Sequence, residues 1–242
     1  MTLKDYLKRA QKEKWAVGQF NISNLETLRA IIQAAKNLKS PVIIGTSEGE
    51  SKFIGLRQAR ALVKSFKEDT GLPIFLNLDH GKDLDYIKEA VQVGYDAVHF
   101  DGSKLPLEEN IEITKKAIKI ARTKNIWLEG EVGIIGGELT SPEEAKRFFE
   151  ETKVDSLAVN VGSRHGIGEE HIDFQKLKEI SNSLKQVPLV LHGGSGVPDE
   201  EIKSAIKLGI VKININTELR VAFTESLKES LNKTPEEIIP YK

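Results

Sequence analysis

Three of the five histidines share a sequence context that favours metal binding. His80, His165 and His192 each follow an apolar run and directly precede a glycine. Such runs are typical of buried strands, so each imidazole is expected at a strand end, and catalytic zinc is commonly held by three protein ligands. One of these histidines alone would more often be an ordinary turn residue, but the recurrence predicts a zinc site. His99, inside an apolar run, and His171, in a charged segment, are expected to serve core packing and the surface.

Several carboxylates lie near the same predicted strand ends. Asp79 directly precedes His80, so it could exchange a proton with a substrate hydroxyl, or it could orient an imidazole. Glu129 and Glu131 are two residues apart and share one face of a strand. Two like charges there are costly unless a cation lies between them. We therefore expect Glu131, with Asp101, to help hold a positive ion.

Two glycine-rich segments are candidates for substrate contacts. Val132–Thr140 contains three glycines and Glu138, a composition typical of a lid that carries a carboxylate over a site, with a plain flexible loop as the alternative. Further on, Gly193–Gly196 follows one apolar run. The next run ends in the polar residues Asn214, Asn216 and Thr217. Barrels often bind phosphate between the loops at this point of the chain, so a phosphorylated substrate is predicted.

Apolar runs alternate with amphipathic segments along the whole chain. Eight runs are predicted as strands: Ala16–Asn21, Pro41–Thr46, Ile74–His80, Ala97–Gly102, Ile126–Val132, Ser156–Gly162, Leu189–His192 and Val211–Asn216. Six segments have helical periodicity: Leu25–Leu38, Leu84–Val93, Leu107–Thr123, Pro142–Glu151, Phe174–Leu184 and Glu200–Leu208. Plausible N-caps for four of these helices are Asn24, Asp83, Ser141 and Asp173.

This alternation predicts a parallel sheet with helical crossovers. Eight such units in 242 residues match the count and length of a closed (β/α)8 TIM barrel. An open doubly wound sheet is the alternative, but no Gly-x-Gly-x-x-Gly turn follows the first run. Without a linker or a change of composition, residues 1–242 are expected to form one domain. In a barrel of this type the chemistry lies at the carboxyl ends of the strands, where the polar residues above, with Asn21 and Ser47, are predicted to converge.

The composition excludes several classes of partner. The net charge is −1, with acidic and basic residues interspersed, so neither nucleic acid nor an anionic membrane surface is expected as a partner. The absence of cysteine rules out disulfides and thiolate metal sites and agrees with a reducing cytoplasm. The N-terminus lacks the apolar core of a signal peptide, and no stretch approaches a transmembrane span. We expect a cytoplasmic protein.

Taken in order, several segments resemble the class II, metal-dependent fructose-bisphosphate and tagatose-bisphosphate aldolases over nearly the whole chain. The matching segments are Ala16–Asn21, Ser40–Ile44, Ser47–Gly49, Leu78–Gly81, Phe100–Pro106, Gly130–Gly133, Gly136–Glu138, His165–Gly166, His192–Gly196 and Lys212–Glu218. The resemblance implies reversible cleavage of a ketose bisphosphate such as fructose 1,6-bisphosphate to dihydroxyacetone phosphate and glyceraldehyde 3-phosphate. It also implies a sugar phosphate as small-molecule partner and assembly as a homodimer or homotetramer.

The resemblance also implies roles for individual residues. The implied zinc ligands are His80, His165 and His192. Asp79 would donate and accept the proton, Glu138 would be the acid of a mobile loop, and Asp101 and Glu131 would hold a metal in a buried alternative position. The implied substrate-binding positions are Asn21, Ser47, Gly166, Gly193, Gly194, Ser195, Asn214, Asn216 and Thr217. The carbonyls of Gly166 and Gly193 would also face a monovalent cation such as Na⁺ or K⁺, and Lys212 is expected inside the barrel in a structural role.

Two features depart from the family pattern. The segment after His165 is short and lacks a Tyr-Lys pair, and Arg164 is not the residue expected beside it. The chain ends at Pro240–Lys242, where relatives continue into a helix with basic contacts to the distal phosphate. Weaker binding of the second phosphate, or a smaller aldehyde partner, is therefore expected, and tagatose-bisphosphate cleavage is an alternative. A three-histidine zinc hydrolase, against which Asp79 and the phosphate loops argue, and a non-catalytic phosphosugar-binding barrel are the other candidate functions.

Overall fold

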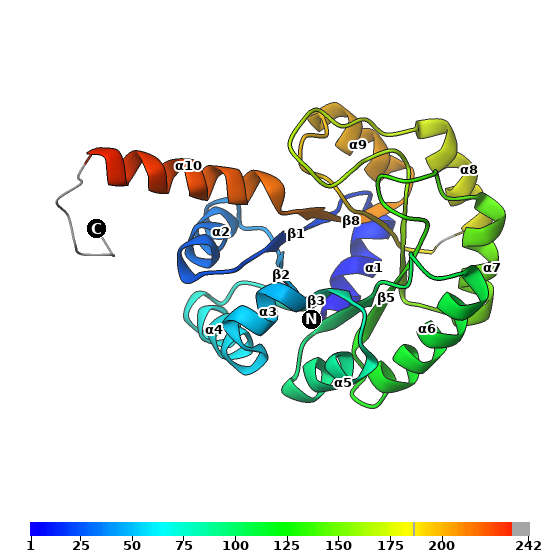
Figure 1. Ribbon diagram of the computed structural model, residues 1–242, viewed down its shortest axis with the longest axis horizontal. Coiled ribbons are helices and arrows are strands. Elements are labelled where there is room, and N and C mark those ends of the chain that lie inside the picture. The colour runs from blue at the N-terminus through cyan, green and yellow to red at the C-terminus, as the bar shows by residue number, and fades with distance from the viewer. Residues whose placement is uncertain (186, 234–242) are drawn as a thin grey trace.

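The computed structural model describes residues 1–185 and 187–233, and eight parallel strands in this part of the chain close into a barrel (Figure 1). The strands follow one another around the ring in chain order, and β8 pairs with β1. They are β1 (Val17–Asn21), β2 (Val42–Ser47), β3 (Ile74–Gly81), β4 (Ala97–Phe100), β5 (Trp127–Val132), β6 (Ser156–Val159), β7 (Leu189–Leu191) and β8 (Ile210–Ile215). The (β/α)8 barrel expected from the sequence is confirmed.

Helices alternate with the strands and form an outer ring. They are α1 (Leu3–Glu13), α2 (Leu25–Leu38), α3 (Glu48–Ile54), α4 (Leu56–Thr70), α5 (Leu84–Val93), α6 (Leu107–Arg122), α7 (Pro142–Thr152), α8 (Phe174–Leu184), α9 (Asp199–Lys207) and α10 (Thr217–Lys233). At the four predicted N-caps, Asn24, Asp83, Ser141 and Asp173, the side chain accepts a backbone N–H of the first turn. Helices α1, α3, α4 and α10 were not predicted from the sequence.

The main hydrophobic core lies between the strands and the outer helices. In β5, Leu128 and Val132 are buried on the side that faces the helices, and Gly130 lies between them. A Cβ at Gly130 would lie only 2.8 Å from the ring of Phe148 in α7. Glycine therefore lets α7 pack close to the sheet, where burial of apolar area stabilises the fold by roughly 25 cal/mol per Å².

The amino-terminal end of the barrel is closed by α1, which lies within the ring of outer helices (Figure 1). Thr2 and Asp5 form a capping box that starts this helix. Leu3 and Leu7 are buried in a second apolar cluster that includes the barrel side chains of Phe75 and Trp127. Because this end is filled by apolar packing, the polar groups of the lumen open toward the carboxyl ends of the strands.

Above this apolar layer, the lumen is lined by buried polar side chains. They include Gln19, Asn77, Glu129 and Lys212, each exposed by 3% or less. Successive side chains of a strand point to opposite faces, so these residues turn inward while their apolar neighbours face the helices. The apolar runs seen in the sequence therefore describe mainly the outer face of the sheet, and the inner face carries a polar network.

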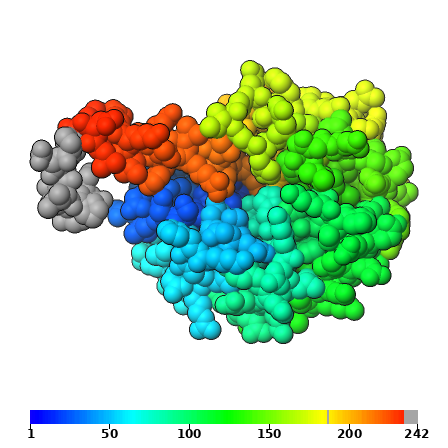
Figure 2. Space-filling model, viewed as in Figure 1, coloured from blue at the N-terminus to red at the C-terminus, as the bar shows by residue number. Residues whose placement is uncertain are grey.

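Helix α10 stands away from the body of the molecule. It follows β8 and projects from the barrel, and none of its residues is buried (Figure 1, Figure 2). Its side chains Phe223, Leu227 and Leu231 recur every four residues and are exposed. Pro240–Lys242, on which the expectation about the distal phosphate rested, lie outside the described residues. Within the described ranges, none of the helices combines the length and the hydropathy needed to cross a membrane.

Candidate active site and metal centre

A cavity of about 450 Å³ opens at the carboxyl ends of the strands. Twelve residues singled out in the sequence line it: Asn21, Ser47, Asp79, His80, Asp101, Glu131, His165, Gly193, Ser195, Asn214, Asn216 and Thr217. Every strand of the barrel contributes to this set, either from its last residues or from the loop that follows it. The barrel closure therefore gathers side chains that are far apart in the sequence.

His80 and His192 face each other across the lumen. Nε2 of His80 lies 3.2 Å from Nδ1 of His192. The other nitrogen of each ring meets a carboxylate, since His80 Nδ1 lies 2.9 Å from Oδ2 of Asp101 and His192 Nε2 lies 2.9 Å from Oε1 of Glu129. A carboxylate only accepts hydrogen bonds, so each neutral ring carries its proton on that side. The two remaining lone pairs converge on one point, as they do when two histidines bind one metal ion.

The donor atoms around this point suit a divalent metal ion. Two groups of ligand atoms each lie within 4.8 Å of one another: Asp79, His80, His99 and His192 in the first, and His80, Asp101 and Glu131 in the second. Imidazole nitrogens and carboxylate oxygens bind zinc and several other divalent ions. The carboxylate behind His80 and the one behind His192 would fix the orientation of both rings and make them better ligands.

His165 lies near this cluster on its solvent side. Its ring centroid is 5.3 Å from that of His80 and 6.2 Å from that of His192, whereas the His80 and His192 centroids are 4.8 Å apart. It follows β6 in an exposed loop. Partial burial and the neighbouring His192 lower the pKa of His165, which keeps this imidazole neutral and able to bind a metal ion at neutral pH. Of the three expected imidazoles, His80 and His192 thus belong to a group of close ligand atoms, whereas His165 lies beside that group and its role as a ligand stays a prediction.

His99 lies in the metal-binding cluster, although the sequence predicted no site role for it. It is fully buried in β4, as expected, but its ring centroid lies 5.0 Å from that of His80 and 4.9 Å from that of His192. The available signal was its spacing of two residues from Asp101, which gives both residues the same parity. His171 lies on the surface, as expected, where its Nδ1 is 2.7 Å from a carboxylate oxygen of Glu201.

Asp79 is a buried carboxylate in the wall of the cavity. Nδ2 of Asn21 donates to its Oδ2 at 3.0 Å, and Nδ2 of Asn214 donates to its Oδ1 at 3.1 Å. Burial by itself would raise the pKa of Asp79, but its polar surroundings, first of all the neighbouring His80 and then His99, hold that pKa well below its usual range. Asp79 is therefore ionised at neutral pH and oriented by two amides, which suits a group that accepts a proton.

A buried ion pair lies beneath the metal-binding cluster. Nζ of Lys212 is 2.7 Å from Oε2 of Glu129, whose other carboxylate oxygen meets His192. Burial would raise the pKa of Glu129, but Lys212 and His192 hold it far below its usual range. The position of Lys212 agrees with the structural role expected from the sequence. Glu129, noted there only for its spacing from Glu131, is a direct partner of a candidate ligand.

Glu138 does not line the cavity. It is exposed and borders a separate hollow of about 310 Å³. The amide of Asn160 donates to the carbonyl oxygens of Ile134, Gly137 and Glu138 at 2.8, 3.1 and 2.9 Å. The Asn160 side chain thus holds the segment expected to act as a lid, together with hydrogen bonds at Thr140, and the catalytic role of Glu138 stays a prediction that requires the loop to move.

Gly166 and Gly194 also lie outside the set of described residues that line the cavity. The N–H of Gly194 donates to the carbonyl oxygen of Asn214 at 3.0 Å. At Gly193 φ is 63°, and a Cβ there would lie 2.6 Å from the carbonyl oxygen of Arg164. The loops after β6 and β7 therefore meet at a point where only glycine fits. The monovalent cation expected near Gly166 and Gly193 stays a prediction.

In the loop after β7, one backbone N–H already binds a carboxylate of α10. The N–H of Gly196 donates to Oε1 of Glu218 at 3.0 Å, and the N–H of Glu218 lies 3.4 Å from Oγ of Ser195. Backbone N–H groups at the beginning of a helix favour negatively charged partners. A substrate phosphate at this place would compete with Glu218 for the N–H of Gly196.

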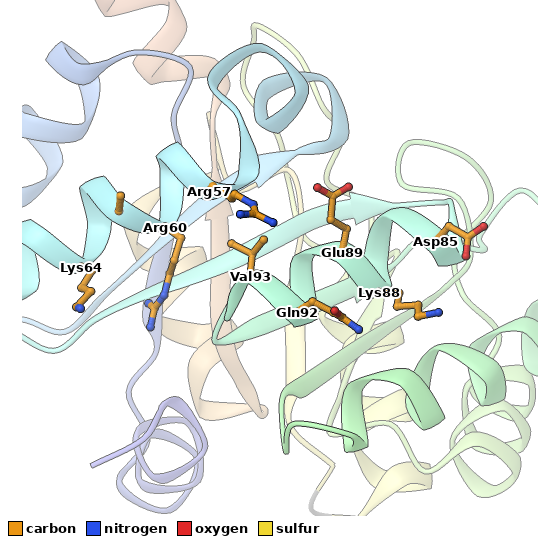
Figure 3. A pocket seen from close by; sticks show the side chains of 9 residues that line it. Arg57, Arg60, Lys64, Asp85, Lys88, Glu89, Gln92 and Val93 are labelled. Atoms are coloured by element: carbon orange, nitrogen blue, oxygen red, sulfur yellow. The ribbon is translucent and has the colours of Figure 1, made fainter.

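A larger hollow of about 750 Å³ lies on the outer surface between α4 and α5 (Figure 3). Charged side chains of both signs line it: Arg57, Arg60, Lys64, Asp85, Lys88 and Glu89. None of the residues that line it comes from the ends of the strands, and none is a histidine. Size alone does not identify the active site here, because the candidate ligands His80, Asp101 and Glu131 line the smaller cavity.

Comparison with known proteins decides the family. The family model described as fructose-bisphosphate aldolase class-II matches residues 1–241. The chain belongs to this family. As a class II aldolase the protein is a lyase that acts on sugar phosphates, and the metal dependence of the family agrees with the cluster of histidines and carboxylates in the barrel.

Similar class II aldolases carry more than one substrate name. The chain is 43% identical to the sulfofructosephosphate aldolase of Alkalicoccus urumqiensis, over 97% of this chain and 86% of that protein. It is 39% identical to the fructose-bisphosphate aldolase of Geobacillus stearothermophilus, over 100% of this chain and 89% of that protein. Among crystal structures, the YdjI aldolase from Escherichia coli K12 has a TM-score of 0.87 and 35% identity, over 96% of this chain and 88% of that one. The aldolase reaction is common to these names, whereas the substrate is not.

Proposed function

We propose that this protein is a zinc-dependent ketose-bisphosphate aldolase, with residues 1–242 as one catalytic domain. The reaction is the reversible cleavage of fructose 1,6-bisphosphate to dihydroxyacetone phosphate and glyceraldehyde 3-phosphate. The observation that supports it best is the pair of facing ring nitrogens beside the ionised Asp79. Nε2 of His80 and Nδ1 of His192 lie 3.2 Å apart. A metal ion next to a base is the combination that carbon–carbon cleavage beside a carbonyl group requires.

Each side chain has a defined role in this proposal. His80, His165 and His192 would hold the zinc ion, which would supply a Lewis acid for the substrate carbonyl. Asp79 accepts the proton of the hydroxyl next to the bond that breaks and returns it in the condensation direction. The two amides that donate to its oxygens keep this carboxylate ionised and directed into the cavity.

The phosphate of the dihydroxyacetone half is assigned to the loops after β7 and β8. Ser195 and Thr217 provide hydroxyl groups there, and Asn216 provides an amide. Glu218 would have to release the N–H of Gly196 for the phosphate to bind it. The opposite half of the substrate then extends toward the basic side chains at the mouth of the cavity.

Removal of the metal ion should abolish cleavage, because the substrate carbonyl is then no longer polarised. The measurement is a coupled assay with fructose 1,6-bisphosphate and tagatose 1,6-bisphosphate in parallel, before and after chelation and after addition of zinc. Zinc should restore the rate, and the faster sugar identifies the configuration that the site prefers. Cleavage that persists in the chelated protein would contradict the metal mechanism. A folded, zinc-loaded protein that cleaves neither sugar would instead favour a non-catalytic phosphosugar-binding role.

A ketose phosphate with a sulfonate in place of the second phosphate is the other candidate substrate, because a protein 43% identical is named for it. The mouth of the cavity carries four basic side chains: Lys82, Lys104, Arg164 and Arg220. Arg220 binds Glu50 at 2.7 Å and Arg164 binds Glu170 through Nε at 3.1 Å. Both arginine side chains are still more than half exposed, at 62% and 64%. They can therefore meet an anionic group at the far end of the substrate.

Replacing Arg164 with Gln should weaken binding only of substrates that carry this distal anion. We expect KM for the preferred anionic substrate to rise about tenfold or more, since a hydrogen bond to a charged group contributes roughly 1.5–3 kcal/mol. The cleavage rate of fructose 1-phosphate, which lacks the second anion, should not change. Lys88→Gln, on the outer surface between α4 and α5, is the matched control. An equal loss with both substrates would contradict a role in recognising the distal group.

Three further properties belong to the proposal. The exposed row Phe223, Leu227 and Leu231 on α10 would be covered in a homodimer or homotetramer. The absence of cysteine and the use of sugar phosphates favour a cytoplasmic location. A dependence of the rate on Na⁺ or K⁺ would support the monovalent cation expected between the loops of Gly166 and Gly193.

A further inference from the structure

The backbone at His80 has an unusual conformation. Its φ is 50°, in the left-handed region that residues other than glycine seldom adopt. At the same place the pairing of β3 with β4 changes register between Leu78 and Gly81, which marks a β-bulge. A strained conformation of this kind persists only where the surrounding structure holds it.

This bulge allows two neighbouring residues to act in the same site. Asp79 and His80 are adjacent, and in a regular strand their side chains would point to opposite faces of the sheet. Yet Asp79 binds Asn21 and Asn214 inside the barrel, while His80 faces His192 across the same lumen. The change of register therefore turns the imidazole inward beside the base.

The His99 side chain holds the bulge in place. Its Nδ1 accepts the backbone N–H of His80 at 3.1 Å. Regular pairing resumes directly afterwards, where the N–H of Asp101 donates to the carbonyl oxygen of Gly81 at 2.8 Å. The imidazole of His99 thus provides the hydrogen-bond acceptor for an N–H at the point where the register of the two strands shifts.

The same hydrogen bond fixes the proton of His99. Because Nδ1 uses its lone pair for the His80 N–H, the neutral ring must carry its proton on Nε2. That nitrogen lies 3.2 Å from Oε2 of Glu131. Both atoms are buried, and neither makes a hydrogen bond to any described residue, so this is a close polar contact between the ring and the carboxylate.

The arrangement also decides whether His99 is itself a metal ligand. Its nitrogens lie close enough to those of Asp79, His80 and His192 for that role. A proton on Nδ1 would point at the N–H of His80, so this hydrogen bond requires an unprotonated Nδ1. With Nδ1 bound to the backbone and Nε2 protonated, neither nitrogen has a lone pair for a metal ion.

We propose that His99 is a positioning residue that holds the bulge at His80 through Nδ1 and the carboxylate of Glu131 through Nε2–H. It thereby keeps the imidazole of His80 and the carboxylate of Asp79 on the same side of the sheet. The inference rests on the proposed function only in taking His80 as a ligand of the divalent ion.

Asparagine and glutamine separate the two contacts of His99. The side-chain oxygen of Asn can occupy the place of Nδ1, so His99→Asn keeps an acceptor for the His80 N–H and loses the reach to Glu131. The amide nitrogen of Gln can occupy the place of Nε2, so His99→Gln keeps a donor to Glu131 and loses that acceptor. His99→Leu removes both contacts. The surface substitution His171→Asn is the control.

Zinc affinity, measured by competition with a chromophoric chelator, is the main readout, with kcat and KM alongside. His99→Leu should bind zinc about 10- to 100-fold more weakly, as is typical when the partner that orients a metal ligand is lost. His99→Asn should keep most of the affinity, and His99→Gln should not. Wild-type affinity in His99→Leu, or rescue by Gln and not by Asn, would overturn the inference.

Imidazole ¹⁵N spectra of the wild-type protein test the same point without a substitution that endangers folding. In the zinc-loaded protein His99 should have an unprotonated Nδ1 and a protonated Nε2, and neither should show the shift of a zinc-bound nitrogen. A zinc-bound nitrogen on His99, or a proton on Nδ1, would overturn the inference. Failure of the wild-type protein to bind zinc would contradict the proposed function instead, and the tautomer measured in the metal-free protein would then decide the role of His99.

Discussion

Replacing Asp79 with alanine should lower kcat by roughly 10²- to 10⁴-fold, the contribution typical of a positioned general base. Asp79 is ionised, and Asn21 and Asn214 direct its two oxygens. Zinc binding should persist, because the facing nitrogens of His80 and His192 remain. The loss should therefore appear in kcat for every ketose phosphate that the protein cleaves, measured with zinc at saturation.

Alanine is a better choice than asparagine at this position. The side-chain amide introduced by Asp79→Asn would place its NH₂ group against one of the two donors, Asn21 or Asn214, and would add a structural defect to the chemical one. The matched control is Asp69→Ala, which removes an exposed carboxylate near the end of α4. An Asp79→Ala variant with normal zinc content and a kcat near that of the wild type would show that the proton moves through another group.

Replacing Lys212 with methionine should destabilise the barrel by about 3–5 kcal/mol, the cost of leaving one charge of a buried ion pair without its partner. Lys212 is 3% exposed and Glu129 is 1% exposed, and their charged atoms are 2.7 Å apart. The double substitution Lys212→Met with Glu129→Gln should recover much of this stability, because it leaves no buried charge. It should not recover zinc affinity, since the amide is a weaker partner for His192 than the carboxylate.

The pH dependence of stability gives an independent check on this ion pair. The native pKa of Glu129 lies far below its value in the unfolded chain, so its contribution is complete above pH ~4.3, the ordinary glutamate value, and is lost as pH falls toward the native pKa. In Lys212→Met the carboxyl of Glu129 takes up a proton more readily. The difference in the free energy of unfolding between this variant and the wild type should therefore shrink in acid. Urea midpoints for the single and double variants at neutral and acid pH measure both effects. A single variant as stable as the wild type would show that the lumen accepts an unpaired carboxylate.

The sequence was sufficient for the fold and for the rim of the barrel. Alternation of apolar runs and helical segments predicted the eight strands in order, and the caps Asn24, Asp83, Ser141 and Asp173 were found where expected. The short helix α3 and the helix α4 were missed in a segment that contained no predicted element. Helix α10 was missed because its apolar positions bury nothing in this chain.

The interior of the site could not be predicted from the sequence. Parity indicated that Glu129 and Glu131 share a face, but only the closed barrel shows that Lys212 reaches the first and His99 the second. The proton positions that separate a ligand from a supporting residue depend on which carboxylate or N–H lies behind each ring. The conformation of the loop that carries Glu138 depends on Asn160, a contact that no spacing reveals.

The positions of His80 and His192 on the ring have a mechanical consequence. They lie on β3 and directly after β7, four strands apart in a ring of eight, so they project from opposite walls of the barrel although 112 residues separate them in the chain. An ion held by both rings would connect opposite walls of the barrel. Because a ligand that binds only the folded state stabilises it, metal content should affect the stability of the whole barrel as well as its chemistry.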